Sequence, residues 1–457
     1  MVLGKRFEAF VERSPVSVMV RGVLERAFDA DRLDGLFERT AETQYTRELW
    51  FSTLVRLMSE VVLGVSPSVH AAYQDAAEPL GVSVTAVYDK LAGVEPRVSA
   101  ELVRDSARHL SAVIEELNGR IPPLLKDYRV LILDGNHLSG TEHRLKELRR
   151  MRAAALPGQA LVVLDPALML IVDVLAWEDA HDQERALLEQ IVPKVQPRDL
   201  WIDDRNFCTT KFLFGIHRQQ GCFLVRQHAS TLHWELLGKR QSRGRVPTGR
   251  VYEQTVRLKN PATGESLRAR RITIQLAEPT REGESQVHLL TNLPAQDADA
   301  RQVAKLYLQR WTIERVFQDL AVALTCEIHT LGYPKAALFG FCLALVAYNA
   351  ISLIQAALRA VHGTAKVQAE ISWYYVCVHL SKVYTGMMIA VPARHWDLFR
   401  RLEVHEFAAL LKELATGIDL RRFRKHPRGP KKPPPKKISG VKISHVATAR
   451  ILAKRSP

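Results

Sequence analysis

The spacing of apolar residues changes along the chain and divides it into segments. In residues 1–125 the apolar side chains recur at helical spacing, most clearly in 48–64. From Tyr128 onward, short continuous apolar runs are bounded by Gly, Pro, Asn and Asp, as in buried strands. The pattern therefore predicts a helical N-terminal region followed by a segment that contains a sheet.

The second segment predicts a specific order of elements. Strands are expected at 128–134, 160–165, 168–175, 199–203 and 222–228, and helices at 182–192 and 209–220. Only Pro166 and Ala167 separate the second and third runs, which indicates a tight hairpin. Three antiparallel strands followed by two crossover units predict an α/β fold with a ribonuclease-H-like mixed sheet.

The remaining pattern completes the predicted organisation. Short β-like runs at 251–258, 267–277 and 286–293 indicate a β-rich insertion, and 298–324 reads as one long helix. The Pro- and Lys-rich stretch 424–445 is not expected to pack.

The predicted units are a helical N-terminal region (1–125), the first part of the catalytic domain (126–228), the β-rich insertion (229–293), the second part of the catalytic domain with a Glu-bearing helix (294–360), a helical C-terminal region (361–425) and a basic tail (426–457).

One apolar stretch, 336–357, is about long enough to cross a bilayer. It stands alone, and it contains Gly340, Asn349, Ser352 and Gln355. We therefore expect a buried core helix and no membrane partner; a membrane span is the alternative. The first 15 residues lack the 7–15-residue apolar run of a signal peptide, so we expect a cytoplasmic location.

The charge of the chain is uneven. The 457 residues carry 64 Lys+Arg and 49 Asp+Glu, a formal charge of +15. Residues 421–457 hold 13 of the basic side chains and no acidic one, which leaves 51 basic and 49 acidic groups in residues 1–420. Such a tail favours a polyanion, with nucleic acid ahead of an anionic membrane. The five cysteines form no C-x2-C pair and are expected to be reduced, buried thiols.

Two short helical patterns in 68–93 flank a break at Pro79 and Gly81, with Ser83 in the position of an N-cap. This arrangement resembles a helix-turn-helix, which would place 83–92 in a DNA major groove. An ordinary helical hairpin is the equal alternative.

Three acidic residues stand where chemistry is expected. Asp134 ends the first predicted strand, Asp204 follows the fourth, and Glu314 lies on the long helix. Carboxylates at the ends of neighbouring strands can converge, and three of them would suit a pair of Mg²⁺ ions, which prefer oxygen ligands. Taken singly, each acid is more commonly a cap, a loop start or a solvated group, so the hypothesis rests on their order in the fold.

The helix around Glu314 carries a further pattern. Tyr307, Arg310 and Glu314 share one face at spacing i, i+3, i+7. The arginine could hold a phosphate oxygen beside a metal ligand; an intrahelical ion pair is the simpler interpretation.

The sequence YLQRWTIERVF resembles the Tyr-x2-Arg-x3-Glu signature of DDE-type insertion-sequence transposases. The segments ILDG (132–135), DDRNF (203–207) and TNL (291–293) fit the same family in the same order. The resemblance covers about residues 128–360. It departs from the family at Ala321, where the full signature has a lysine that would contact phosphate.

The resemblance implies a Mg²⁺-dependent enzyme, with Mn²⁺ as a substitute, that cleaves double-stranded DNA at the ends of its element and joins the 3′ ends to target DNA. Asp134, Asp204 and Glu314 would be the metal-binding catalytic residues, with Asp203 as an alternative to Asp204, and Tyr307 and Arg310 would contact DNA. It also implies a homodimer or larger synaptic complex, associated with the nucleoid. The basic residues of 144–152 are candidate backbone contacts, namely Arg144, Lys146, Arg149, Arg150 and Arg152. The rival readings are a decayed, binding-only derivative and another metal-dependent nuclease of the same fold.

Overall fold

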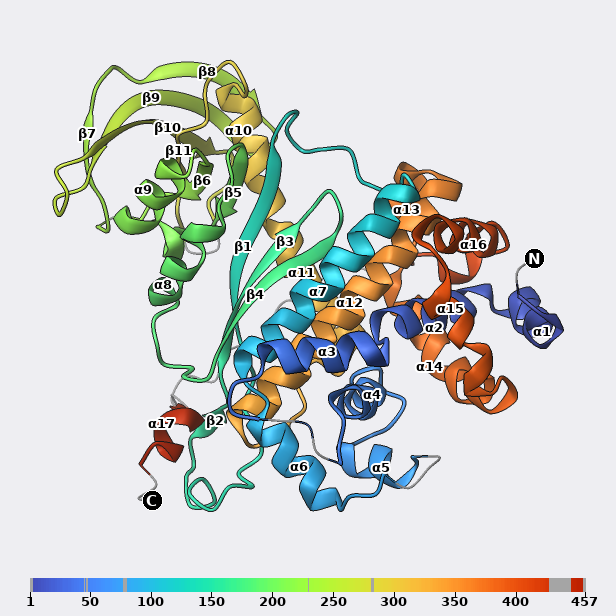
Figure 1. The fold of residues 1–457 in the computed structure, drawn as a ribbon. Coiled ribbons are helices and arrows are strands. Elements are labelled where there is room, and N and C mark those ends of the chain that lie inside the picture. Colours follow the sequence, from blue (N-terminus) through green and yellow to red (C-terminus); the bar gives the residue numbers. More distant parts are fainter. Residues whose placement is uncertain are drawn as a thin grey trace.

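A mixed β-sheet flanked by helices forms the centre of the protein (Figure 1). The computed structural model describes residues 3–44, 46, 48–76, 80–228, 230–280, 283–426 and 445–454. The first five strands of the sheet lie in the order β4-β3-β1-β5-β6. Strands β4, β3 and β1 are antiparallel, whereas β5 and β6 run parallel to β1. This order confirms the predicted ribonuclease-H-like sheet. The strands are β1 (Arg129–His137), β3 (Gln159–Asp165), β4 (Leu170–Trp177), β5 (Asp199–Asp203) and β6 (Cys222–Arg226).

The β-rich insertion extends this same sheet. Strand β11 pairs antiparallel with β6, and the order continues through β10 and β9 to β7, with β8 also on β9. The catalytic sheet and the insertion therefore share one hydrogen-bonded surface. The insertion strands are β7 (His233–Leu236), β8 (Gln241–Val246), β9 (Gly249–Lys259), β10 (Ser266–Leu276) and β11 (Gln286–Thr291).

Helices from both ends of the chain cover one face of the sheet. Helix α7 packs on β4 and on the long central helix α12, which also contacts α2, α4 and α16. One apolar core joins these helices to the sheet. The helices are α1 (Lys5–Arg13), α2 (Pro15–Ala27), α3 (Ala30–Thr40), α4 (Phe51–Val62), α5 (Val69–Gln74), α6 (Val84–Gly93), α7 (Pro96–Glu116), α12 (Pro334–His362), α13 (Thr364–Glu370), α14 (Trp373–Ala390), α15 (Asp397–Arg401) and α16 (Val404–Thr416), with 3-10 turns at Ala393–His395 and Leu420–Phe423.

Helix α12 contains the apolar stretch 336–357, for which the sequence allowed either a buried core helix or a membrane span. It is the one helix in the described part of the chain that is long and apolar enough to span a bilayer, and its apolar window is wholly buried within the protein. Asn349 accepts a hydrogen bond from the Ile171 backbone N–H at 2.8 Å and donates one to its carbonyl at 2.9 Å. The polar residues of α12 thus tie it to strand β4, and the predicted core helix is confirmed.

The predicted helix-turn-helix segment forms α5 and α6. The Ser83 hydroxyl accepts a hydrogen bond from the Ala86 N–H at 3.2 Å, as expected of an N-cap, and residues 77–79 lie outside the described part. Helix α6 packs on α12 and exposes Thr85 and Asp89. Its insertion into a DNA groove remains a prediction.

Two predicted helices differ from the structure. The segment 182–192 forms only one helical turn, α8 (Glu184–Leu187), followed by 3-10 turns at Leu188–Gln190 and Val192–Lys194. Pro193 lacks an N–H and cannot continue an α-helical ladder. The segment 298–324 is interrupted: α10 (Ala300–Tyr307) and α11 (Trp311–Ala323) are joined by a 3-10 turn at Leu308–Arg310, and the tighter winding there changes the direction of the side chains. Helix α9 (Thr210–Arg218) occurs where it was predicted.

The end of the chain also differs from the prediction. Most of 424–445 lies outside the described residues, but Arg424 bridges to Ile371, and residues 445–454 form β12 (His445–Ala447) and α17 (Thr448–Leu452). Strand β12 pairs with β2 (Ala154–Leu156). The expectation that 424–445 does not pack is wrong at its described ends, Arg424 and His445, whereas 446–454 lies beyond that stretch. The reason is a small apolar cluster, in which Val446, Ile451 and Leu452 pack on Leu145, Leu148 and Ala155.

The described cysteine side chains, Cys208, Cys222, Cys326 and Cys342, are free and buried, as predicted. The side chain of Cys377 lies outside the described part.

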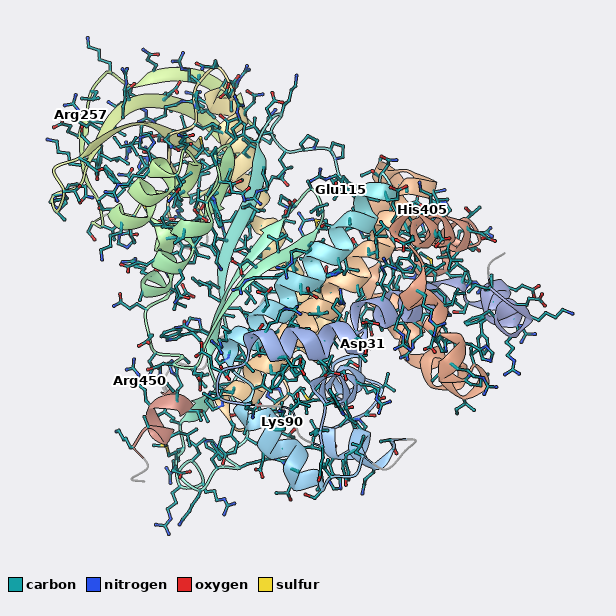
Figure 2. All side chains as sticks on the ribbon, in the orientation of Figure 1. Asp31, Lys90, Glu115, Arg257, His405 and Arg450 are labelled. Carbon is teal, nitrogen blue, oxygen red and sulfur yellow. The ribbon has the colours of Figure 1, made fainter. Side chains whose placement is uncertain are left out.

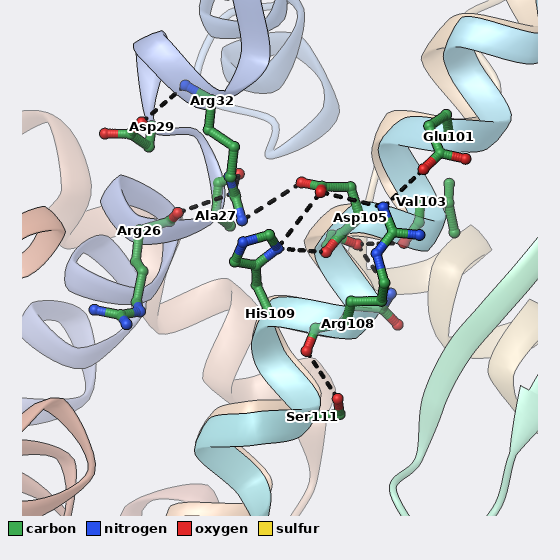
Figure 3. A network of polar contacts seen from close by, with 12 residues as sticks. Arg26, Ala27, Asp29, Arg32, Glu101, Val103, Asp105, Arg108, His109 and Ser111 are labelled. Atoms are coloured by element: carbon green, nitrogen blue, oxygen red, sulfur yellow. Dashed lines mark hydrogen bonds and ion pairs between the residues drawn. The ribbon is translucent and has the colours of Figure 1, made fainter. Parts of the chain in front are cut away.

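A buried ionic network fixes α7 against the N-terminal helices (Figure 3). The Asp105 carboxylate lies 3.5 Å from Arg32 Nη1 and 3.3 Å from Arg108 Nη2. Arg32 also donates a 3.0 Å hydrogen bond to the Arg26 carbonyl at the end of α2. Burial lowers the pKa of the Arg32 guanidinium, and the charge of Asp105 opposes that shift. Asp105 therefore holds a buried cation in place.

We expect Asp105→Ala to lower the free energy of unfolding by about 3 kcal/mol, because it removes the larger of the two counter-charges of the buried Arg32 guanidinium and leaves only Asp29. Urea unfolding followed by circular dichroism measures this. Asp31→Ala on α3 is the control, since Asp31 is exposed and its loss should cost below about 1 kcal/mol. Equal losses in the two variants would contradict a structural role for the network.

Candidate active site

The two candidate aspartates lie at the ends of adjacent parallel strands. Ile132 on β1 is level with Ile202 on β5, and Leu133 is level with Asp203. Because side chains alternate along a strand, Asp134 and Asp204 fall on the same face as these isoleucines. Asp204 keeps an extended backbone (φ −76°, ψ 168°), so the alternation continues to it. Both aspartates therefore face the layer that contains α10 and α11.

Glu314 reaches the same place from the first turn of α11. The Arg310 guanidinium lies between the acids: its Nη1 is 3.3 Å from Asp134 Oδ2, and its Nη2 donates a 2.6 Å hydrogen bond to Glu314 Oε1. The charge of Asp204 also acts on this guanidinium. The structure thus brings together Asp134, Asp204 and Glu314 around Arg310, as the sequence predicted for neighbouring strand ends.

The electrostatics of the site follow from burial and like charge. Burial raises the pKa of the Asp134 carboxyl to about 7, and the charges of Asp204 and Glu314 add to the shift while Arg310 opposes it. Tyr307 is also buried, and burial raises the pKa of its phenol. Arg310 is itself buried, at 8% exposure. A cation at this position therefore reduces repulsion between three converging carboxylates.

The acids are oxygen donors of the kind that Mg²⁺ and Mn²⁺ take. Among the described residues, however, no group of three or more carboxylate, histidine or cysteine side chains is arranged to hold a metal ion. The Arg310 guanidinium lies between Asp134 and Glu314 and pairs with both. The donor set fits a divalent cation in its chemistry, and such a cation would have to compete with Arg310.

Asp203, the alternative to Asp204, has a different environment. It lies on the opposite face of β5, on the side of Trp201, and neither of its carboxylate oxygens has a hydrogen-bond partner. Burial raises the pKa of this fully buried carboxyl well above its usual range, and the charges of Asp134 and Asp204 add to the shift. Asp203 is therefore a neutral acid beside a second apolar cluster, which lies on the other face of the sheet and includes Leu133, Trp201 and Phe223.

The Glu184 side chain packs closely against Gly135, the residue after Asp134. A Cβ atom at position 135 would clash with Glu184 Oε1. Glu184 is also 3.7 Å from His137 Nδ1. A larger residue at 135 would displace Glu184 at the end of β1.

The predicted basic segment is exposed. Arg144, Lys146, Arg149, Arg150 and Arg152 all lie at the surface in the turns before β2. Arg144 is paired with Glu142 at 2.7 Å. The C-terminal helix α17 packs against this segment. Arg450 of α17 (Figure 2) pairs with two aspartates that follow β4, Asp179 and, at 2.9 Å, Asp182.

The insertion carries basic side chains that the sequence analysis did not single out. Lys239, Arg240, Arg245 and Arg250 are exposed around β8, without an ion pair to any described residue. The Arg240 guanidinium lies 3.8 Å from the centre of the Tyr252 ring, and Arg271 lies 5.1 Å from that of Trp234. The signal was present in KRQSRGR (239–245), where basic residues recur within the predicted β-rich insertion but outside its predicted strands.

His288 on β11 gives this region a pH response. Burial lowers its pKa to about 4, and the nearby charges of Arg271, Arg240 and Arg226 add to the shift. Its Nδ1 lies 3.0 Å from the Thr273 hydroxyl. The folded protein therefore keeps this ring neutral at pH values where the unfolded chain, with a histidine pKa near 6.5, takes up a proton.

We expect the wild type to lose stability relative to His288→Gln as the pH falls from about 6.5 to 4. In this window the unfolded wild type binds up to one more proton than the folded protein. Its free energy of unfolding therefore falls more steeply with falling pH than that of the variant, by at most about 1.4 kcal/mol per pH unit. Urea unfolding of both proteins at a series of pH values measures it. Parallel stability curves for the two proteins would show that His288 does not titrate in this way.

Two comparisons with known proteins found matches for this chain. Residues 125–350 match the family model described as the transposase DDE domain. A solved structure of a piggyBac transposase synaptic complex with hairpin DNA is similar at a TM-score of 0.39 and 12% identity, over 85% of each chain. No curated protein matches the chain in sequence.

The ribonuclease-H-like sheet, with acids at two adjacent strand ends and on a helix, has the arrangement expected of a DDE-type domain. Residues 125–350 are a transposase DDE domain by their match to that family.

Proposed function

We propose that this transposase binds the ends of its own insertion sequence, cleaves the phosphodiester bonds there and joins the freed 3′ ends to target DNA. The observation that carries the proposal is the convergence of Asp134, Asp204 and Glu314, from three separate elements, around one buried arginine.

Asp134, Asp204 and Glu314 would hold Mg²⁺, or Mn²⁺ in its place. When bound, a pair of such ions supplies an activated attacking oxygen and stabilises the leaving oxygen in an in-line displacement at phosphorus. The three carboxylates would bind the ions only in their charged form. Burial of Asp134 therefore makes cation binding weaker as the pH falls below about 7.

Arg310 would act on the substrate. Its guanidinium has paired N–H donors that match phosphate oxygens. In the structure these donors are directed to Asp134 and Glu314. In the reaction it would exchange a carboxylate for a phosphate oxygen, while Tyr307 packs beside it. Ala321 is exposed on α11 and offers no such contact.

The remaining assignments concern DNA and assembly. The exposed basic residues of 144–152 and those around β8 would contact the DNA backbone without reading its sequence. Two element ends must be held together, so we propose a homodimer or larger complex. We also propose a cytoplasmic location, on the nucleoid.

The test is cleavage of a duplex that carries the terminal repeat of the element, with Mg²⁺ or Mn²⁺, by the wild type and by Glu314→Ala. We expect the wild type to cut at the repeat boundary, and the variant to bind the same DNA but lose cleavage. Binding by the wild type without cleavage in either metal would leave a binding-only derivative. Cleavage that ignores the repeat would indicate a general nuclease.

A further inference from the structure

A basic groove lies away from the active site, between the N-terminal helix α1 and helix α15 of the C-terminal region. It is a cavity of about 590 Å³ that we name the α1–α15 groove, and it is lined by residues 4–7, 394, 395, 397, 398 and 401. In Figure 1, α1 and α15 lie on the side of the molecule opposite the insertion strands, with α11 between them. Packing contacts link them in the order α1, α2, α14 and α11.

The groove has a firm apolar floor. The Phe7 ring packs edge-on against Trp396 at 5.0 Å and against Phe399 at 6.2 Å between ring centres. Trp396 and Phe399 are fully buried, and Phe7 is nearly so. These aromatic contacts fix α1 against α15, so the polar side chains around them extend from a packed base.

The rim of the groove is almost entirely cationic. Its basic members are Lys5, Arg6, Arg394 and Arg401, all exposed and without an ion pair to any described residue. His395 also lines the groove, and its Nε2 has no hydrogen-bond partner among the described residues. The acidic lining residue, Asp397, is already paired with Arg400. Like charges gathered without counter-charges repel one another, so the groove is suited to an anion from outside the chain.

We propose that the α1–α15 groove binds the phosphodiester backbone of duplex DNA, as a second contact site beyond the active site. The lining favours this ligand because it offers four cations without an ion pair to a described residue and few hydrogen-bond acceptors with which to read a base edge. Binding there is independent of sequence and sensitive to salt. The proposal rests on the proposed function in one respect, which is the choice of DNA as the polyanion.

The test compares two triple variants of equal charge. The groove variant is Lys5→Ala, Arg394→Ala and Arg401→Ala; the control is Lys126→Ala, Lys366→Ala and Arg39→Ala, which removes exposed cations from other surfaces. Fluorescence anisotropy measures the binding of a duplex of about 40 base pairs at several salt concentrations. We expect the groove variant to bind at least about tenfold more weakly, and its slope of log K against log salt to be smaller by about 2 to 3.

Several outcomes would overturn the proposal. Equal weakening in both variants would show an effect of net charge alone, and no weakening in the groove variant would show that the groove does not contact DNA. Thermal stabilisation of the wild type by inorganic phosphate or by anionic vesicles, lost in the groove variant while DNA affinity is unchanged, would assign the groove to another anion.

Two controls keep the result interpretable. Thermal melting checks that the groove variant folds, and a second variant, Arg394→Lys with Arg401→Lys, keeps the charges and should retain DNA binding. Cleavage of a terminal-repeat duplex separates this proposal from the proposed function. If the wild type never cleaves but the groove still binds DNA, only the proposed function fails; if it cleaves and the groove variant binds DNA as well as the control does, only the groove proposal fails.

Discussion

Asp204→Asn is expected to lower DNA cleavage at least about a thousandfold, whereas Asp203→Asn, one residue earlier, should leave it within a few-fold of the wild type. Asp204 shares the face of Asp134 and faces α11, where its charge acts on Arg310 and on Asp134. A cation held by these acids contributes several kcal/mol to transition-state stabilisation, and about 1.4 kcal/mol corresponds to tenfold in rate. Removing one acidic ligand charge should therefore remove most of the activity.

Asp203 provides the matched control because the same change is made at the adjacent position. Its carboxyl is buried on the opposite face and is held neutral by burial, so an amide of similar size replaces an uncharged group. We expect its free energy of unfolding to change by no more than about 1 kcal/mol. Single-turnover cleavage of a terminal-repeat duplex and urea unfolding measure the two effects. Loss of cleavage in a stably folded Asp203→Asn, with activity kept in Asp204→Asn, would reverse the assignment.

The second large effect is expected for Arg310→Ala, which should lower cleavage by about 10² to 10³ while making divalent cations bind more tightly. The lost cleavage follows from the loss of a charged donor to the phosphate. The gain in cation binding follows from the present contacts, because the guanidinium occupies the space between Asp134 and Glu314. Without it, the three carboxylates repel one another, and the pKa of Asp134 is no longer held down by a positive neighbour.

Thermal melting with and without Mn²⁺ measures this competition. A cation that binds tenfold more tightly adds about 1.4 kcal/mol of stabilisation near saturation, so the shift in melting temperature should be larger in the variant than in the wild type. Arg315→Ala is the control, since Arg315 is exposed on the same helix and has no ion pair to a described residue. Equal Mn²⁺ shifts in all three proteins would contradict the competition between Arg310 and the metal.

Much of the fold was readable from local patterns. Strands β1, β3, β4, β5 and β6 are mostly buried, so they appear in the sequence as the five continuous apolar runs that were predicted. The core helix α12 was readable for the same reason, since an element buried all round is apolar all round. The candidate acids could be selected because their order along the chain matched the order of these elements.

Other features depended on contacts between distant segments. The packing of 445–454 on β2 could not be read from a basic, Pro-rich neighbourhood, because three apolar side chains suffice once a partner surface exists at 145–155. The interruption of the long helix at Leu308–Arg310 could not be predicted, because the sequence has no proline or glycine there to indicate a break. The α1–α15 groove joins residues nearly 400 positions apart.

The sequence by itself determined the family, the order of the strands and the identity of the three acids as candidates, because each of these is recorded in local spacing and motif. Only the tertiary structure decided which of two adjacent aspartates faces Glu314, because that depends on the register of β1 with β5 and on which face α11 covers. It also decided that Arg310 lies between the acids, because a buried guanidinium takes the position where the charges of separate elements converge.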